Sequence, residues 1–129
     1  MFSLNDSNRF YLYTEPTDMR KSFYSLSGIV KDKMGFNIFD GDAFIFINKG
    51  LNSIKVLHME SGGLVIYYMK LERGCIQLPD MSSWEDKTSA KTSWTDLIMM
   101  VEGISLSDCK RAKRWCPETS LQMTENQSK

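Results

Sequence analysis

The sequence has no excess of charge of either sign, and it is poor in the residues that build metal centres and disulfide frameworks. Its 129 residues include 16 basic and 16 acidic side chains, three cysteines and one histidine. A balanced charge provides no bulk field toward nucleic acid, so any such contact must come from local patches. Three cysteines without a C-x-x-C pair argue against a disulfide framework and a four-ligand zinc site.

Long apolar runs and targeting segments are also missing. No stretch approaches the roughly 18 apolar residues that a membrane span needs. The first residues lack the basic and apolar regions of a secretory signal. With 42% hydrophobic and 25% charged residues, the composition is that of one globular domain. We therefore expect a cytoplasmic protein with no membrane partner.

The first third of the chain predicts a strand followed by a helix. Residues 9–14 alternate as a half-buried strand does, and the proline that follows ends it. Thr17 is the expected N-cap, with Asp18 favourably placed near the positive end of the helix. Apolar side chains at spacings of four, three and four then predict a helix over residues 18–34. Gly35 is its expected stop.

Two cations at the start of this predicted helix lie off its apolar stripe. They are Arg20 and Lys21, and Tyr24 follows one turn later. Because their side chains are not expected to pack in the core, they are the first candidates for a binding surface.

The middle of the chain predicts short strands joined by tight turns. Ser61-Gly62-Gly63 is a strong hairpin signal, since glycine accepts positive φ without strain. Such turns favour antiparallel neighbours over parallel crossovers. The expected strands cover residues 43–47, 54–59, 64–70 and 75–78.

The last part of the chain predicts one more helix and a tail. Residues 80–92 are polar and predict an exposed loop, and Ser93 can cap a helix over residues 94–102 with Gly103 as its stop. The expected fold class is α+β: one domain in which a main helix packs on a small antiparallel sheet, with a second, C-terminal helix. Its expected limits are residues 9–105, after a leader of residues 1–8 and before a basic, then polar and partly disordered tail of residues 106–129.

The tail contains a basic cluster with one aromatic residue. Cations at this density could neutralise phosphates, and the tryptophan could stack on a base or pack back on the domain. A solvated segment anchored by its tryptophan explains the same pattern. The residues are Lys110, Arg111, Lys113, Arg114 and Trp115.

Catalytic and metal-binding patterns are weak. Asp40 and Asp42 flank a glycine, which is more typical of a turn than of a metal site. Glu85 and Lys87 match a minimal nuclease E-x-K pattern, but they lie in the predicted loop. His58 falls in a strand-like run, where a structural role is the simpler interpretation. The sequence therefore predicts no catalytic residue, no metal, no cofactor and no small-molecule substrate, and a metal-dependent nuclease is the less favoured alternative.

Several motifs, in order and with few gaps, resemble a family of transposition accessory proteins. The family is the TnpB protein of insertion sequence 66-type bacterial elements, which is unrelated to the RNA-guided nuclease that shares the letters. The resemblance covers about residues 9–117, and Lys110–Arg114 is similar to the basic tail of one branch of the family. The motifs that carry it lie at residues 16–23, 44–48, 54–58, 62–68, 70–74 and 94–104.

The resemblance implies an accessory role beside a separate transposase of the same element, with no catalytic residues to carry over. Relatives have an Arg-rich connection after the Phe-x-Phe strand, whereas residues 48–53 keep one cation here. Two interpretations stay open: the domain contacts DNA, or it docks on the transposase through Tyr24 and the exposed face of the first helix. The candidate binding residues are Arg20, Lys21, Tyr24, Lys55, Lys70 and Arg73, with the tail cluster.

Overall fold

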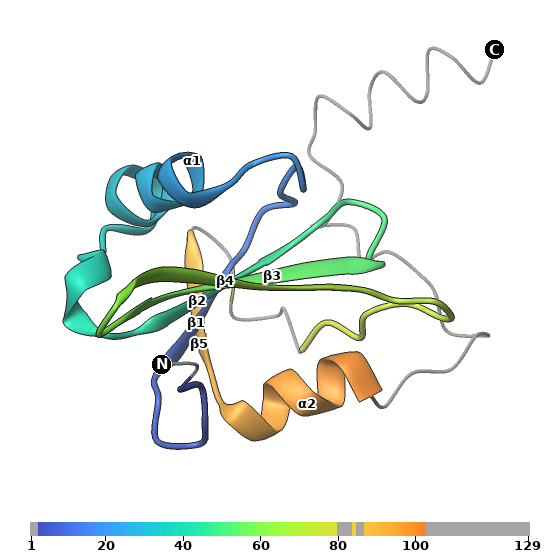
Figure 1. Ribbon diagram of the computed structural model, residues 1–129. Helices are drawn as coiled ribbons and strands as arrows, with labels where there is room; N and C mark the ends of the chain where they lie inside the picture. Colours follow the sequence, from blue (N-terminus) through green and yellow to red (C-terminus); the bar gives the residue numbers. More distant parts are fainter. Residues whose placement is uncertain (1–2, 80–83, 85–86, 103–129) are drawn as a thin grey trace, which may run out of the picture.

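The protein is a five-stranded sheet with one helix on each face. The computed structural model describes residues 3–79, 84 and 87–102. Helix α1 (Phe23–Ile29) covers one face, and helix α2 (Trp94–Glu102) covers part of the other (Figure 1). The α+β class is therefore confirmed.

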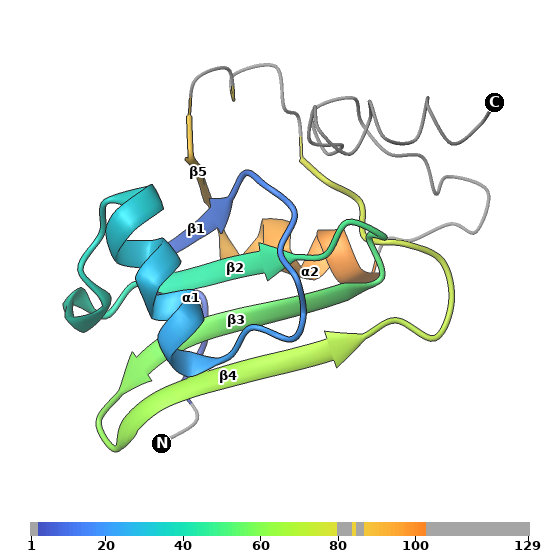
Figure 2. The ribbon, with the colours of Figure 1, turned by 90° about the horizontal axis from the view of Figure 1, so that it is seen from above.

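The strands follow the order β4-β3-β2-β1-β5 across the sheet (Figure 2). The antiparallel run β2–β3–β4 was predicted from its tight turns, and it forms. The strand bounds are β1 Phe10–Tyr13, β2 Ala43–Ile47, β3 Ser53–Glu60, β4 Gly63–Lys70 and β5 Ser89–Thr92.

The central pair, β1 and β2, is parallel, so the sheet is mixed rather than antiparallel throughout. Phe10 lies opposite Ala43, and Leu12 lies opposite Ile45. The connection through α1 is long enough to return the chain to the end where β1 began, which parallel pairing requires. Turn signals in the sequence predict only the pairing of strands that a tight turn connects. A long segment with α1 separates β1 from β2, so their pairing was not predicted.

Two expectations for the second half of the chain were wrong. Residues 75–78 do not form a strand, because the backbone N–H groups of Ile76 and Gln77 donate to Leu51 and Met100 outside the sheet. Residues 80–92 are not wholly an exposed loop, since residues 89–92 form β5 against β1. The short polar sequence of β5 shows no strand pattern. It forms a strand because the edge of β1 that does not face β2 offers it backbone hydrogen-bonding groups.

Helix α1 begins later than predicted. Thr17 is buried rather than a cap, and its N–H donates to the Ile47 carbonyl at 2.8 Å. Ser22 is the N-cap residue, and the Ser25 hydroxyl accepts a hydrogen bond from the Ser22 N–H at 2.9 Å. Tertiary hydrogen bonds to the sheet therefore hold residues 17–21 out of the helix.

The end of the first helix agrees with the prediction. A π-helical turn, η1 (Val30–Met34), continues α1, and Gly35 ends it with a φ of 78°. This left-handed conformation costs glycine little.

A short 3₁₀ helix, η2 (Ile38–Asp40), precedes β2. Ser93 caps α2 as expected, because its hydroxyl accepts from the Asp96 N–H at 3.1 Å.

Each face of the sheet carries its own hydrophobic core. Alternation along the strands sends successive side chains to opposite faces. Beneath α1 the fully buried residues are Leu26, Val30, Phe44, Phe46 and Leu57. On the α2 side the core includes Phe10, Leu12, Ile45, Ile76, Trp84 and Leu97, and Leu4 from the N-terminal segment packs against it.

Candidate nucleic-acid interface

The topology brings loops that are distant in sequence to one end of the sheet. Strands β1, β2 and β4 finish at this end, and β3 and β5 start there. In Figure 2 the arrowheads of β2 and β4 point to it, and the segment after β1 crosses above the sheet beside it. We call this region the basic end; its cations are Arg20, Lys21, Lys49, Lys70, Arg73 and Lys87.

Backbone hydrogen bonds fix the loops of the basic end to the sheet and to one another. Besides the bond from Thr17 to Ile47, the Leu71 N–H donates to Asn52 at 2.7 Å. Within residues 48–53, the Asn48 side-chain oxygen accepts from the backbone N–H groups of Asn52 and Ser53, each at 3.0 Å. Hydrogen bonds therefore tie the loops that carry these cations to the sheet and to one another.

Lys55 holds the segment that carries the first two cations. It is 7% exposed, and its ammonium donates to the carbonyls of Met19 and Lys21, each at 2.7 Å. The same ammonium lies 4.8 Å from the centre of the Tyr68 ring, which is a cation–π distance. The candidate Lys55 thus lies beneath the surface and fixes the backbone on both sides of Arg20.

Arg20 is exposed, but its charge is shared with a neighbour. Its guanidinium binds Asp18 through several hydrogen bonds, the shortest at 2.7 Å, and 91% of its side chain is exposed. Hydrogen bonds from Arg20 to the carboxylate lower the pKa of Asp18 to about 2. Asp18 therefore stays ionised at neutral pH, where it orients the guanidinium and partly cancels its charge.

The remaining cations of the basic end differ in exposure. Lys21, Lys70, Arg73 and Lys87 are exposed, and Lys49 is half-buried. Alternation places Lys70 on the α1 side of the sheet, the side of Lys55 and Tyr68. The α1 face of the basic end therefore combines exposed cations with a half-exposed tyrosine ring.

A hollow of about 410 Å³ separates two of the loops. Residues 16–19 line one wall, and residues 48–50 line the other. The motif that begins at Pro16 and the connection after β2 therefore meet at this one place in the fold.

Some predicted binding residues lie elsewhere. Tyr24, in the first turn of α1, is 89% exposed. The tail cluster of residues 110–115 lies outside the described residues. Sequence reasoning missed Tyr68, and the signal that could have found it is its register opposite Lys55 across β3 and β4.

The opposite end of the sheet carries a buried polar cluster. The Glu60 carboxylate accepts from the Tyr67 hydroxyl at 2.6 Å and from the Ser3 N–H at 3.1 Å, and it lies 3.0 Å from His58 Nδ1. Burial acts to raise the pKa of Glu60, but hydrogen bonds from Tyr67, His58 and Ser3 outweigh it and lower the pKa to about 2. His58 is 4% exposed, and its Nε2 also lies 3.1 Å from the Gly41 carbonyl, which agrees with a structural role. Asp42, which the sequence offered as a possible metal ligand, instead forms an ion pair with Arg9 at 2.7 Å.

This cluster predicts an acid-sensitive contribution to stability. A carboxyl group with a depressed pKa stabilises the fold above its ordinary value of 4.5, and that contribution disappears as the pH falls toward about 2. Glu60→Gln should lower the free energy of unfolding by about 1–3 kcal/mol at pH 7, with a smaller difference near pH 2. Urea unfolding across this range measures the effect. The exposed Glu72→Gln is the control, and an equal loss at both pH values would contradict the prediction.

Within the described parts of the chain, no group of three or more histidine, cysteine or acidic side chains is placed to hold a metal ion. Over the same residues, neither helix has the length and apolar character that crossing a bilayer requires.

The structure is that of a small α+β domain with cations gathered on the loops at one end of its sheet. The comparisons give the family: a model described as IS66 Orf2 like protein matches residues 8–111, and the chain belongs to that family. It is also 32% identical over 66 residues to a protein of Sinorhizobium fredii named only as uncharacterized protein y4hO. That match covers 51% of this chain and 57% of the relative, so the chain spans little more than half of the relative's length. No solved structure matches the chain significantly.

Proposed function

We propose that this protein is a non-catalytic accessory factor for transposition of a bacterial insertion sequence, and that it contacts DNA through its basic end. Membership of the IS66 Orf2-like family supports the accessory role. The DNA contact rests on one observation: loops far apart in sequence place six cations at one end of the sheet.

The charge distribution favours phosphate contact at that end. Its described loops carry six cations against the carboxylates of Glu15, Asp18 and Glu72. The other end mixes three cations with four exposed or paired aspartates and the buried Glu60. Although the whole chain is neutral, this asymmetry gives one positive face, and phosphate contacts need only a local positive surface.

A gel-shift titration against duplex DNA tests the proposal. The wild-type protein should bind at low salt, with an affinity that falls steeply as salt is added, because bound cations displace counterions. Lys21→Glu combined with Lys70→Glu should weaken binding by about tenfold or more and make the salt dependence shallower by about 2 on a log–log plot.

The matched control reverses two cations at the other end of the molecule. Lys31 and Lys33 lie exposed on η1, so Lys31→Glu with Lys33→Glu changes the net charge equally. Equal losses in both double variants would mean that only net charge matters. That result, or no binding by the wild type at low salt, would refute DNA contact through the basic end.

One observation favours a second candidate function, docking on the transposase of the same element. Tyr24 is 89% exposed and Phe23 beside it is 41% exposed, and exposed aromatic side chains are common at protein interfaces. Co-purification with the transposase should then be lost in Tyr24→Ala while DNA binding is kept. Absence of any wild-type complex at micromolar concentration would reject this alternative.

A further inference from the structure

The two edges of the sheet differ in how they are protected. Edge strands expose unpaired backbone groups, and proteins usually shorten such strands or place charges on them. Strand β5 has four residues and carries Lys91. Strand β4 has eight residues. Its one charged side chain, Lys70, is at the last position, and residues 64–69 before it are aliphatic, aromatic or methionine. The described residues thus give one protected edge and one unprotected edge.

The unprotected edge carries exposed apolar side chains on both faces. Tyr68, on the α1 side, is 55% exposed, and Met69, on the α2 side, is 48% exposed. None of the described strands pairs with the outer side of β4. A long apolar edge left open in this way favours association with another strand.

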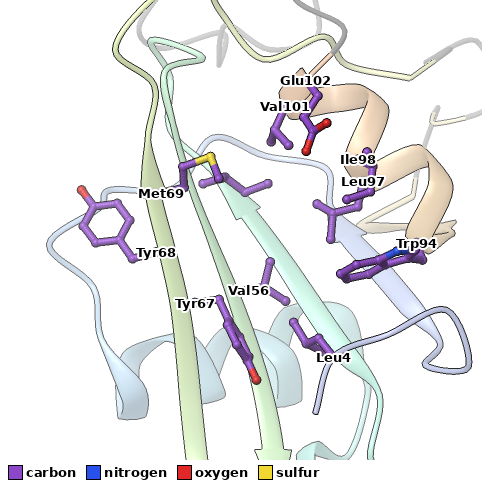
Figure 3. Close-up of a pocket in the computed structure, with 11 residues that line it drawn as sticks. Leu4, Val56, Tyr67, Tyr68, Met69, Trp94, Leu97, Ile98, Val101 and Glu102 are labelled. Atoms are coloured by element: carbon purple, nitrogen blue, oxygen red, sulfur yellow. The ribbon is translucent and has the colours of Figure 1, made fainter. Parts of the chain in front are cut away.

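An apolar groove adjoins the same edge. It has a volume of about 440 Å³ and lies between β4 and α2, so that Met69 faces Val101 and Ile98 across it (Figure 3). Ile54 and Val56 of β3 contribute to its lining. A strand added to β4 would carry its own side chains toward the open side of this groove.

We propose that a second copy of this chain pairs with β4, antiparallel and about a two-fold axis, to make one continuous sheet. Such an interface uses the same surface on both copies. In this arrangement residues that point to the same face lie opposite one another. With the axis at the middle of the strand, at Ile66 or Tyr67, Tyr68 meets Leu64 or Ile66 of the second copy, and Met69 meets Gly63 or Val65.

Charge placement favours the antiparallel arrangement. Lys70, at the end of β4, lies opposite Gly62 or Leu64 of the second copy, so the two Lys70 side chains are kept apart. Parallel pairing in register would set them against each other, and like charges directly opposite destabilise a sheet. The position of Lys70 therefore favours antiparallel pairing of two β4 strands over parallel pairing in register. On the α2 side, Val65 and Met69 of the second copy supply the apolar surface that fits the groove.

Light scattering after size-exclusion chromatography tests the proposal with the full chain. At micromolar concentrations the wild type should have twice the chain's mass. Met69→Lys should raise the dissociation constant of the dimer by about tenfold or more, since it sets a charge in an apolar interface. Met99→Lys makes the same change at an exposed site of α2, outside the groove, and should leave the dimer intact. Circular dichroism establishes that both variants are folded.

Hydrogen exchange identifies what covers the edge. In the dimer the β4 amides should exchange slowly, and Met69→Lys should make them fast. A wild-type monomer throughout the micromolar range would overturn the proposal. Slow exchange of the β4 amides in a monomer would also overturn the proposal, because residues of the same chain would then cover the edge. A dimer that Met69→Lys leaves unchanged would equally overturn it. Each result stands independently of DNA binding.

Discussion

Replacing Lys55 by methionine should lower the free energy of unfolding by about 2–4 kcal/mol. The variant keeps the length and apolar stem of the side chain but removes the donor of two 2.7 Å hydrogen bonds. The carbonyls of Met19 and Lys21 lose their shared partner at a part-buried site, and leaving a buried polar group unsatisfied costs about 1–3 kcal/mol. Urea denaturation measures the loss. Lys33→Met, at an exposed site of η1, should have little effect.

The same variant tests whether Lys55 positions the basic end. If Lys55 acts only by holding residues 19–21, Lys55→Met should weaken DNA binding without changing its salt dependence, because every surface cation remains. If its ammonium contacts phosphate directly, the log–log salt dependence should become shallower by about 1. An unchanged affinity would show that the position of Arg20 and Lys21 does not matter for binding.

Trp84→Ala should have an even larger effect on stability, about 3–5 kcal/mol. Trp84 is 2% exposed and belongs to the core on the α2 side of the sheet, with Ile76 and Leu97. Removing the indole leaves a cavity that neighbouring side chains fill only in part. Thermal or urea unfolding measures the loss.

The control for Trp84 is Met99→Ala, a truncation at a side chain that is 59% exposed. It should change the stability by less than about 0.5 kcal/mol. A comparably small effect of Trp84→Ala would mean that the indole adds little to the core, in contradiction of its burial.

Periodicity and turn chemistry predicted the parts of the fold that depend on nearby residues. The β2–β3–β4 run, the cap of α2 at Ser93 and the stop at Gly35 all follow from local sequence. The late start of α1 does not, because it depends on the bond between Thr17 and Ile47. The strand at residues 89–92 likewise exists because β1 offers it an edge. Local rules fail where a distant partner supplies the hydrogen bonds.

The candidate site shows the same division. Arg20 and Lys21 were identified because no apolar stripe included them, and both lie exposed at the basic end. Lys55 also alternates outward in its strand pattern, yet α1 and the segment before it cover that face. The meeting of these residues with Lys70 and Arg73 depends on strand order, which single-sequence patterns do not give.

The parallel pairing of β1 with β2 has a consequence for the order of folding. Strands β2, β3 and β4 are joined by short turns, so their contacts close small loops and form at low entropic cost. Strands β1 and β5 must wait for partners that are distant in the chain. We therefore expect the three-stranded meander to form first and the outer strands to join late. Because residues 14–22 follow β1, the basic end is complete only after this last, slow step.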